Sequence, residues 1–434
     1  MNSDRARDTT RLTLGSLARV EGEGRLSFTV RHGRVEAAKL NIYEPPRFFE
    51  SFLRGRDFRE PPDITSRICG ICPVAYQVSA CNALEQACGA HLTQPILDLR
   101  RLLYCGEWIA SHTLHIYLLH APDFLGVADA IELARIARLE VERGLALKKA
   151  GNAILDLIGG RSIHPVNVRL GGFYRAPTRR ELEPLAEQLR TALDDALATV
   201  QWVSRFEFPD AEINSELLAL AQPGRYAIED GMVTTTSETS FAPEDFCNHV
   251  EEHQVPHSTA LHAHLDGRAY LTGPLARYSL HAAELSDTAR QAASESGLGT
   301  LCRNPFQSIV VRAVETVYAV DEALRLIREY QRPDRPYVEI SPRAATGYGV
   351  SEAPRGTLYH SYQLDSEGRI LCATIIPPTS QNQAAIENDL RNTLAANLRL
   401  THTDLVALCE RTIRNYDPCI SCATHFLDLT IENA

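Results

Sequence analysis

The sequence predicts an α+β fold that is predominantly α-helical, with a large helical core and two smaller β regions. Long segments have the length and apolar spacing of helices, at residues 73–89, 99–120, 127–158, 181–206 and 310–330. Short alternating segments stand near the N-terminus and between residues 337 and 378. Two cysteine pairs lie far apart in the chain, so a shared site requires a fold that brings them together.

The N-terminal β region is predicted as a hairpin. Apolar and polar residues alternate over 26–30, a His-Gly turn signal follows at 32–33, and the alternation resumes at 35–37. We expect this hairpin to lie on the main body, because one of its faces is apolar.

The helical core begins where Pro73 suits a first helical turn and Gly89 suits the C-terminal stop. Residues 337–378 return to short strands, with a tight connection at 365–368. Two further helices, at 383–397 and 403–415, lead to the C-terminal cysteines.

No repeat, low-complexity segment or linker divides the chain, so we predict one integrated domain over residues 1–434. The predicted parts of this domain are a β-rich N-terminal part, the helical core, a mixed C-terminal part and a short extension, at 1–68, 69–336, 337–425 and 426–434.

Charge and hydropathy exclude some classes of protein. The net charge is −11, and acidic and basic residues are interleaved, so no basic block favours nucleic-acid binding. Residues 1–14 have no apolar leader. The most apolar long stretch, 99–120, contains Arg100, Arg101 and Glu107, which predicts a buried helix and no membrane span. A soluble, cytoplasmic protein is expected.

Four of the eleven cysteines form two C-x-x-C pairs, Cys69 with Cys72 and Cys419 with Cys422. Thiolates select zinc, iron–sulfur clusters or other soft and borderline transition metals. The spacing alone leaves a zinc site, redox dithiols, coincidence and a buried catalytic metal open. The long separation of the pairs argues against a zinc ribbon, which closes a short local loop.

The surroundings of the two pairs are more specific. The first stands in Arg-Ile-Cys-Gly-Ile-Cys at 67–72, and the second in Asp-Pro-Cys-Ile-Ser-Cys-Ala-Thr-His at 417–425. Together they resemble the R-x-C-G-x-C and D-P-C-x-x-C-x-x-H motifs of nickel–iron hydrogenase large subunits. Further segments resemble the same family along nearly the whole chain, at 19–22, 49–57, 160–173, 352–356 and 377–382.

The resemblance implies a nickel ion held by Cys69, Cys72, Cys419 and Cys422. It also implies an iron that shares Cys72 and Cys422 and carries carbon monoxide and cyanide. H₂ would be split heterolytically at this metal pair. The proton would pass to a cysteine thiolate, for which we take Cys419, and then to Glu21. A strand residue on the surface is the alternative interpretation of Glu21.

Other residues around the metals follow from the same resemblance. Arg355 is expected over the iron, where a guanidinium can donate hydrogen bonds to cyanide; the alternative is a surface arginine in a turn. Pro378 and Thr379 are expected beside the metals, with Ser380 as the alternative hydroxyl donor.

A magnesium ion is implied near the C-terminus. Its expected ligands are Glu50, His425 and a backbone carbonyl at about Ile375, since Mg²⁺ prefers oxygen ligands. Three other histidines, His112, His115 and His164, are predicted to be structural.

One residue departs from the family pattern: Tyr76 stands where many relatives have histidine. Together with the expected soluble character and the moderate length of the chain, the segment Cys-Pro-Val-Ala-Tyr-Gln at 72–77 most resembles the cytoplasmic, NAD(P)-linked branch. The chain has no G-x-G-x-x-G, no P-loop and no further cluster-binding cysteine set. Electrons are therefore expected to leave through an iron–sulfur small subunit, and then through flavin- and NAD(P)-binding and iron–sulfur electron-transfer subunits.

Three alternatives remain beside the catalytic hydrogenase: an H₂ sensor with the same site, a non-catalytic scaffold related to a complex I subunit, and a zinc-stabilised structural protein. The resemblance also implies nickel-insertion chaperones and a maturation protease, which would cut after His425 and remove residues 426–434.

Overall fold

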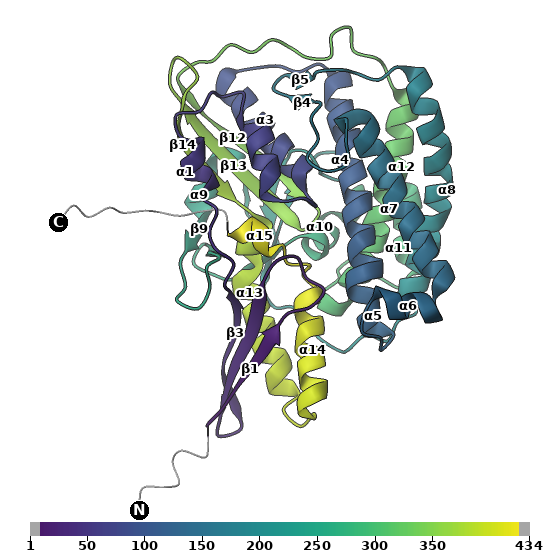
Figure 1. Ribbon diagram of the computed structural model, residues 1–434, viewed down its shortest axis with the longest axis vertical. Helices are drawn as coiled ribbons and strands as arrows, with labels where there is room; N and C mark the ends of the chain where they lie inside the picture. The colour runs from purple at the N-terminus through teal and green to yellow at the C-terminus, as the bar shows by residue number, and fades with distance from the viewer. Residues whose placement is uncertain (1–8, 425–434) are drawn as a thin grey trace, which may run out of the picture.

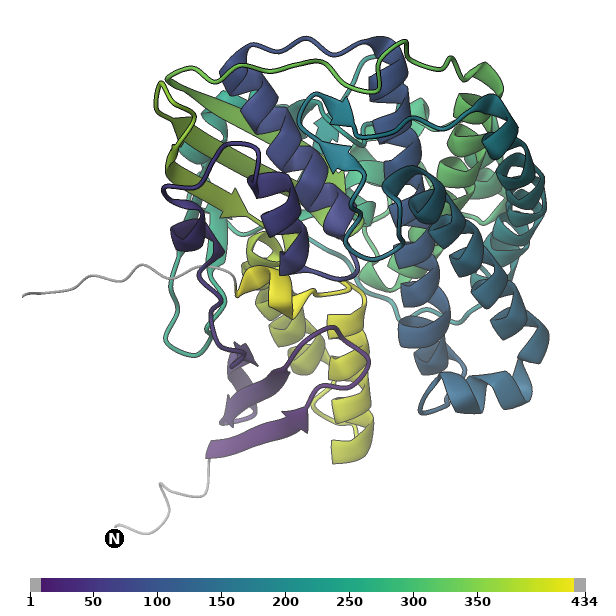
Figure 2. The same cartoon turned by 45° about the horizontal axis from the view of Figure 1, so that its top comes forward.

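The computed structural model describes residues 9–424 and has an α+β fold in which helices predominate (Figure 1). This confirms the predicted fold class. A bundle of long helices forms one side of the molecule, and a three-stranded sheet with a helix lying across it forms the other (Figure 2). The N-terminal sheet and the C-terminal helices lie together below them (Figure 1).

The N-terminal sheet is antiparallel and contains β1 (Thr9–Ser16), β2 (Gly24–Arg31) and β3 (Arg34–Ile42), in that order. The predicted hairpin is β2–β3, and His32 and Gly33 in its turn both have positive φ. Strand β1 was not predicted, because its only apolar residues are Leu12 and Leu14, which make too short an alternating pattern.

Helix α3 (Pro73–Cys88) begins and ends as predicted. Pro73 is in its first turn, and Gly89 follows its last turn with a φ of 65°. The Gly89 amide donates a hydrogen bond to the Gln86 carbonyl, which closes the helix. Because α3 packs on the sheet β12–β14, the cysteine pair just before it is held against that sheet.

The long helices pack side by side. They are α4 (Gln94–Leu114), α7 (Arg138–Gly159), α8 (Arg179–Val203) and α12 (Ser308–Glu329). Helix α4 contacts α7 and α12, and α12 contacts α8. The predicted helix 127–158 is wrong in one respect: it is broken at Ala137, where φ is −137° and ψ is 53°, into α6 (Ala130–Ile136) and α7. The predicted helix 99–120 ends in a π-helical segment, η2 (His115–His120).

Arg100 and Arg101 of α4 are buried and paired with carboxylates. The guanidinium of Arg100 donates to Glu85 Oε2 at 2.6 Å, and that of Arg101 donates to Glu229 Oε2 at 2.6 Å. These ion pairs explain why an apolar helix carries arginines inside a protein. Among the described residues, none of the helices is both long and apolar enough to span a membrane.

The region 207–307 contains strands that the sequence analysis did not predict. They form a four-stranded sheet in the order β11-β6-β7-β8 and the pair β9–β10. Their bounds are β6 (Glu216–Ala221), β7 (Met232–Thr235), β8 (Ser240–Phe241), β9 (Val250–His253), β10 (His262–Leu265) and β11 (Tyr270–Thr272). Strand β11 runs parallel to β6, so this pairing depends on residues far apart in sequence and leaves no local signal.

The C-terminal part agrees with the prediction of strands followed by helices. Strands β12 (Ala345–Ala353), β13 (Gly356–Leu364) and β14 (Ile370–Ile376) form an antiparallel sheet. The predicted connection at 365–368 joins β13 to β14. Helix α13 (Pro378–Ala396) starts five residues earlier than predicted, because Pro378 occupies its first turn. Helices α14 (His402–Arg414) and α15 (Ile420–Ala423) follow.

Shorter elements connect these layers. They are α1 (Phe49–Leu53), α2 (Pro61–Thr65), η1 (Ser66–Ile68), α5 (Ala121–Phe124), β4 (Val168–Arg169), β5 (Gly172–Phe173), η3 (Pro243–Asp245), α9 (Phe246–His249), α10 (Pro274–His281), η4 (Ala282–Glu284), α11 (Asp287–Glu295) and η5 (Pro305–Gln307).

Most buried apolar side chains belong to one cluster that runs from Leu17 to Ala423. A smaller cluster lies between the four-stranded sheet and β12–β13. The large cluster is what a single integrated domain would have, but the predicted domain division itself stays a prediction.

Candidate metal centre

Cys69 and Cys72 lie in the turn between η1 and α3. Cys69 follows η1 in an extended conformation, and Cys72 is the N-cap residue of α3. The Ile71 amide donates to Cys69 Sγ at 3.3 Å. Peptide dipoles stabilise negative charge at a helix N-terminus. Here, however, the lowering effect of Cys419 is outweighed by hydrogen bonding with Cys422 and Cys69, together with burial, which raise the pKa of the Cys72 thiol well above its usual value.

Cys419 and Cys422 lie in and just before the short helix α15. Asp417, two residues before Cys419, has a φ of 49°, which reverses the chain after α14. The Cys419 amide donates to Thr379 Oγ1 at 3.0 Å, and the Ile420 amide donates to the Glu21 carbonyl at 3.1 Å. The second pair is therefore held between α13 and the N-terminal segment.

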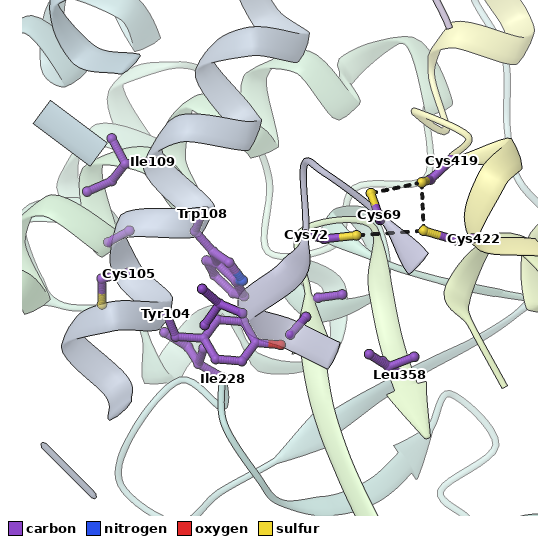
Figure 3. Packing of buried hydrophobic residues seen from close by; sticks show 14 of the residues in the cluster. Cys69, Cys72, Tyr104, Cys105, Trp108, Ile109, Ile228, Leu358, Cys419 and Cys422 are labelled. Carbon is purple, nitrogen blue, oxygen red and sulfur yellow. Dashed lines mark hydrogen bonds between the residues drawn. The ribbon is translucent and has the colours of Figure 1, made fainter. Parts of the chain in front are cut away.

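The four sulfur atoms meet in the interior (Figure 3). The Sγ atoms of Cys69 and Cys419 lie 3.4 Å apart, and those of Cys72 and Cys422 lie 3.7 Å apart. The Sγ atoms of Cys419 and Cys422 are 2.6 Å apart, and all four lie within 4.8 Å of one another. All four residues are buried. This confirms the prediction that the distant pairs come together.

Burial and crowding control the ionisation of the four thiols. Hydrogen bonds from Cys419, Cys422 and Cys72 hold the pKa of Cys69 well below its usual value. Burial raises the pKa of Cys419 well above its usual value, and the neighbouring thiols raise it further. A second thiolate beside the first needs a cation to offset the repulsion, so metal binding and loss of the thiol protons are coupled here.

Arg355 presents a buried cation to the sulfur cluster from the turn between β12 and β13. Its Nε donates to the Asp417 carbonyl at 2.8 Å, and its Nη2 donates to Asp417 Oδ1 at 3.2 Å. Its Nη1 is buried and has no hydrogen-bond partner within the described chain. Burial alone would lower the pKa of Arg355, but Asp417, Cys419, Cys72 and Cys69 raise it well above its usual value. The guanidinium therefore stays charged with one donor group available.

A buried ion pair holds the turn that carries Arg355. Arg277 donates to Glu315 Oε2 at 2.7 Å and to Glu352 Oε2 at 3.0 Å. It also donates to the carbonyls of Ala353 and Pro354. Because the arginine is bonded to both the carboxylates and the turn backbone, it fixes the direction in which Arg355 points.

Glu21 lies against the second cysteine pair. Its Oε2 accepts a hydrogen bond from the Ser421 amide at 3.0 Å, and its backbone forms a parallel bridge with Cys419. Glu21 is half-buried, whereas Glu23 two residues later is exposed. The structure therefore places Glu21, and not Glu23, next to the cysteines.

Gly22 allows this close approach. Its φ is 87°, and a Cβ atom at this position would lie 2.6 Å from Ile420 Cβ. Arg19 secures the same segment, because its Nη2 donates to Asp123 Oδ1 at 2.6 Å. The Arg-Val-Glu-Gly motif thus combines an anchor, a carboxyl group and a close contact with α15.

Thr379 and Ser380 point to different partners. Thr379 Oγ1 accepts from the Cys419 amide, so its own hydroxyl hydrogen remains available to another acceptor. The Ser380 hydroxyl donates to Glu252 Oε1 at 2.6 Å, and its oxygen also lies 3.0 Å from the Pro377 carbonyl oxygen. Both residues are buried, as is Pro378 in the first turn of α13. Of the two hydroxyls, that of Thr379 directly contacts the cysteine segment.

The sequence pattern of nickel-dependent hydrogenases matches residues 47–149 and 236–425. This chain belongs to the nickel-dependent hydrogenase family. The matched ranges include the four cysteines and Arg355, so the resemblance noted from the sequence motifs is confirmed.

Relatives within the hydrogenase family cover nearly the whole chain. The alpha subunit of sulfhydrogenase 1 from Pyrococcus furiosus is 33% identical over 423 residues, which are 96% of this chain and 98% of that protein. The F420-non-reducing hydrogenase from Methanothermobacter marburgensis has a corresponding subunit that is 28% identical over 457 residues, 96% of this chain and 95% of that protein.

Solved hydrogenase structures share the fold. An NAD⁺-reducing nickel–iron hydrogenase in the H₂-reduced state matches with a TM-score of 0.86 and 27% identity, over 96% of this chain and 100% of that one. The Ni-Fe-Se hydrogenase from D. vulgaris Hildenborough matches with a TM-score of 0.76 and 22% identity, over 96% of this chain and 100% of that one.

The chain is a hydrogenase large subunit, the catalytic subunit of an oxidoreductase whose metals are nickel and iron. The predictions of enzyme class and of these two metals are confirmed. Four buried sulfurs fit soft and borderline transition metals, as the hydrogenase family requires.

The residues predicted to bind magnesium are partly brought together. Glu50 on α1 accepts a hydrogen bond from the Ile375 amide on β14 at 2.6 Å. His425 and the predicted extension 426–434 lie outside the described residues. The amide and carbonyl of one strand residue point to the same side, so the Ile375 carbonyl faces the edge where Glu50 lies.

Tyr76, His112 and His115 are buried in the hydrogenase core, and His164 is half-buried. Burial and the nearby Cys422 and Cys72 raise the pKa of Tyr76 well above its usual value, so its hydroxyl stays protonated. His115 Nε2 lies 2.8 Å from the Arg414 carbonyl, and His164 Nδ1 lies 2.8 Å from the Ser66 carbonyl. His112 Nε2 lies 2.9 Å from Glu315 Oε2. These contacts agree with structural roles for the three histidines.

Sequence reasoning missed two residues that support the centre. Glu107 accepts hydrogen bonds from the amides of Val74 at 2.6 Å and Ala75 at 3.0 Å, which fixes the start of α3 beside Cys72. Glu44 Oε1 accepts from the Ser421 hydroxyl at 2.9 Å. A glutamate in the middle of α4 gave no local signal for the first role, and the second depends on a contact between distant segments.

Proposed function

We propose that this subunit catalyses reversible heterolytic cleavage of H₂ to protons and electrons, with nickel bound by all four cysteines and iron sharing Cys72 and Cys422. The observation that carries the proposal is the meeting of four buried thiols beneath the buried guanidinium of Arg355. When bound, the metal pair would accept the electron pair of H₂. The protein residues supply the proton route, the charge balance and the exclusion of water.

The proton route is proposed to run from the Cys419 sulfur to Glu21. Glu21 is the half-buried carboxyl that contacts the Cys419–Cys422 segment, and a positioned carboxyl can accept and release a proton. Ser421 lies between the carboxyl groups of Glu21 and Glu44, with its amide on the first and its hydroxyl on the second. Glu44 is therefore a candidate for the next position outward.

Arg355 and Thr379 are proposed to hold the cyanide ligands of the iron, whose third small ligand would be carbon monoxide. Cyanide accepts hydrogen bonds, and the buried Nη1 of Arg355 has no partner within the described chain. The Thr379 hydroxyl hydrogen is similarly available, while Ser380 is engaged by Glu252. Pro378 packs beside the same group from the first turn of α13.

A magnesium ion is proposed at Glu50, the Ile375 carbonyl and His425. The carboxylate and the strand edge already lie together, and water would complete the octahedral shell. The ion would hold the end of the chain close to Cys422.

The electron acceptor is proposed to be NAD(P)⁺, reached first through an iron–sulfur small subunit, then through a flavin subunit. The match to an NAD⁺-reducing nickel–iron hydrogenase supports this branch. The names of the sulfhydrogenase and F420-non-reducing relatives do not mention NAD. A sulfur compound or an iron–sulfur protein is therefore the second candidate acceptor. The presence of all four cysteines favours catalysis over a non-catalytic scaffold.

Infrared spectroscopy of the purified complex tests the proposed centre. Carbon monoxide and cyanide stretches are expected, together with nickel and iron in near-equal amounts once the iron of the cluster subunits is subtracted. Zinc alone, without those stretches, would contradict a hydrogenase centre. H₂-dependent reduction of NAD⁺ and NADP⁺, compared with sulfur, separates the proposed acceptors.

Arg355→Lys is expected to reduce H₂ turnover about 100-fold, the typical effect of removing one preorganised donor. Lysine keeps the charge but lacks the planar fork that bonds Asp417 and leaves Nη1 available. Turnover and the cyanide stretching frequencies should both change. Arg268→Lys, in an exposed turn, is the matched control and should behave like the parental enzyme. If Arg355→Lys turned over H₂ at the parental rate, the proposed role of Arg355 at the metal centre would be wrong.

A further inference from the structure

A second group of metal-ligating side chains lies where the β9–β10 hairpin packs on the middle of α13. The Nε2 of His257 and the Oε1 of Glu387 are 2.7 Å apart, and His262 completes a group whose ligand atoms all lie within 4.8 Å of one another. None of these residues belongs to the four-cysteine centre or to the predicted magnesium site. Glu387 stands two helical turns along α13 from Thr379.

His262 is the most informative member of the group. It is 4% exposed, and its Nε2 has no hydrogen-bond partner among the described residues. A buried imidazole nitrogen without a partner costs free energy unless another group occupies its lone pair. A neutral imidazole can offer such a free nitrogen to a metal ion.

The group is held by ordered segments on three sides. Glu387 Oε1 also accepts from the Leu40 amide of β3 at 2.9 Å. The loop that carries His257 is tied to the end of β3, because the Thr259 amide donates to the Ile42 carbonyl at 2.8 Å. His262 lies on β10, which packs on α13. The three side chains therefore converge without a large movement of the backbone.

We propose that His257, His262 and Glu387 form a second metal site, which binds Zn²⁺ through two imidazole nitrogens and one carboxylate oxygen. Imidazole and carboxylate ligands suit zinc at about 2.0–2.2 Å, with water in the fourth position. The 2.7 Å hydrogen bond between His257 and Glu387 would open by about 0.6 Å to admit an ion in tetrahedral geometry.

The bound zinc would hold the β9–β10 hairpin on α13, and Glu387 of this site also contacts β3 of the N-terminal sheet through the Leu40 amide. These segments lead directly to the catalytic centre, since Thr379 at the start of α13 contacts Cys419 and Glu44 just beyond β3 contacts Ser421. Metal binding to the folded state alone stabilises it. The site is thus a structural support for the segment that carries Cys419 and Cys422.

The test uses the whole purified hydrogenase complex, incubated with Zn²⁺ and then freed of loosely bound metal by a weak chelator and desalting. Nickel, iron and zinc are counted by mass spectrometry in the parental complex and in His262→Gln and Glu387→Gln. His249→Gln is the matched control, because His249 lies at the base of the same hairpin and bonds to Asp266. X-ray absorption at the zinc edge identifies the ligands.

We expect stoichiometric zinc in the parental complex and in His249→Gln, and its loss in both ligand variants with nickel and iron retained. The absorption data should show a nitrogen and oxygen shell at about 2.0–2.1 Å and no sulfur at about 2.3 Å. A sulfur shell would place the zinc in the cysteine centre and overturn the proposal. A parental complex with full nickel and no zinc would overturn it too. His257 and Glu387 would then form only a hydrogen-bonded pair, with no metal.

If His262→Gln does not assemble, Glu387→Gln keeps the proposal testable, because glutamine can still accept from the Leu40 amide. The melting temperature gives an independent readout. Removing zinc with a strong chelator should lower the melting temperature of the parental complex and leave that of Glu387→Gln unchanged. Equal shifts in both would place the responsible metal elsewhere.

Discussion

Replacing Cys422 with serine is expected to reduce H₂ turnover to background and to remove iron from the centre. Cys422 Sγ lies between Cys72 Sγ at 3.7 Å and Cys419 Sγ at 2.6 Å, so it is placed to join two metals. A serine hydroxyl is harder than a thiol and keeps its proton, so it cannot bridge as a soft thiolate does. Metal content, the infrared stretches and turnover should all be measured on the same preparation.

Cys409→Ser is the matched control for this variant. Cys409 is fully buried in α14 and lies outside the four-sulfur group, and burial raises the pKa of its thiol to about 12. A serine there can donate to the carbonyl one turn earlier in the helix. We expect full metal content and turnover in Cys409→Ser. Iron retention with substantial turnover in Cys422→Ser would rule out the proposed bimetallic centre.

Glu21→Gln is expected to slow H₂ turnover by about 100-fold or more, the usual contribution of a positioned proton carrier. Glutamine is close in size, and its carbonyl oxygen can still accept from the Ser421 amide, but it cannot carry a proton at neutral pH. The metals should remain bound. Conversion of para-H₂ to ortho-H₂ should survive, whereas exchange of H₂ with solvent deuterons should collapse.

Glu23→Gln tests whether any loss is specific to position 21. Glu23 is exposed and lies two residues away in the same segment, so its replacement should leave exchange unchanged. If Glu21→Gln exchanges H₂ with solvent deuterons at the parental rate, the proton route does not pass through Glu21. Glu44→Gln would then be the next variant to examine, because Glu44 contacts Ser421.

The geometry of the hydrogenase centre depends on residues outside the four cysteines. Arg355 faces the sulfurs, yet its position depends on Asp417 and on Arg277, which is bonded to Glu315 and Glu352. Glu107 fixes the start of α3 from another helix. Since Arg355, Arg277 and their carboxylate partners are buried, breaking one of these ion pairs would leave an uncompensated charge inside the protein.

The sequence alone was sufficient for the features that depend on local chemistry. Proline at 73 and glycine at 89 set the ends of α3, and the His-Gly pair at 32–33 set the β2–β3 turn, because these residues restrict or widen the allowed backbone angles. The four cysteines and Arg355 were predicted differently, from the resemblance of their motifs to those of nickel–iron hydrogenase large subunits.

Tertiary structure alone decided the features that depend on contacts between distant segments. The parallel pairing of β11 with β6 and the break at Ala137 have no local signal. Likewise, the engagement of Ser380 by Glu252 and the convergence of His257, His262 and Glu387 arise only when α13 packs against the β9–β10 hairpin. Local preferences act over a few residues, whereas side-chain partners are chosen by packing, and packing is a property of the whole folded chain.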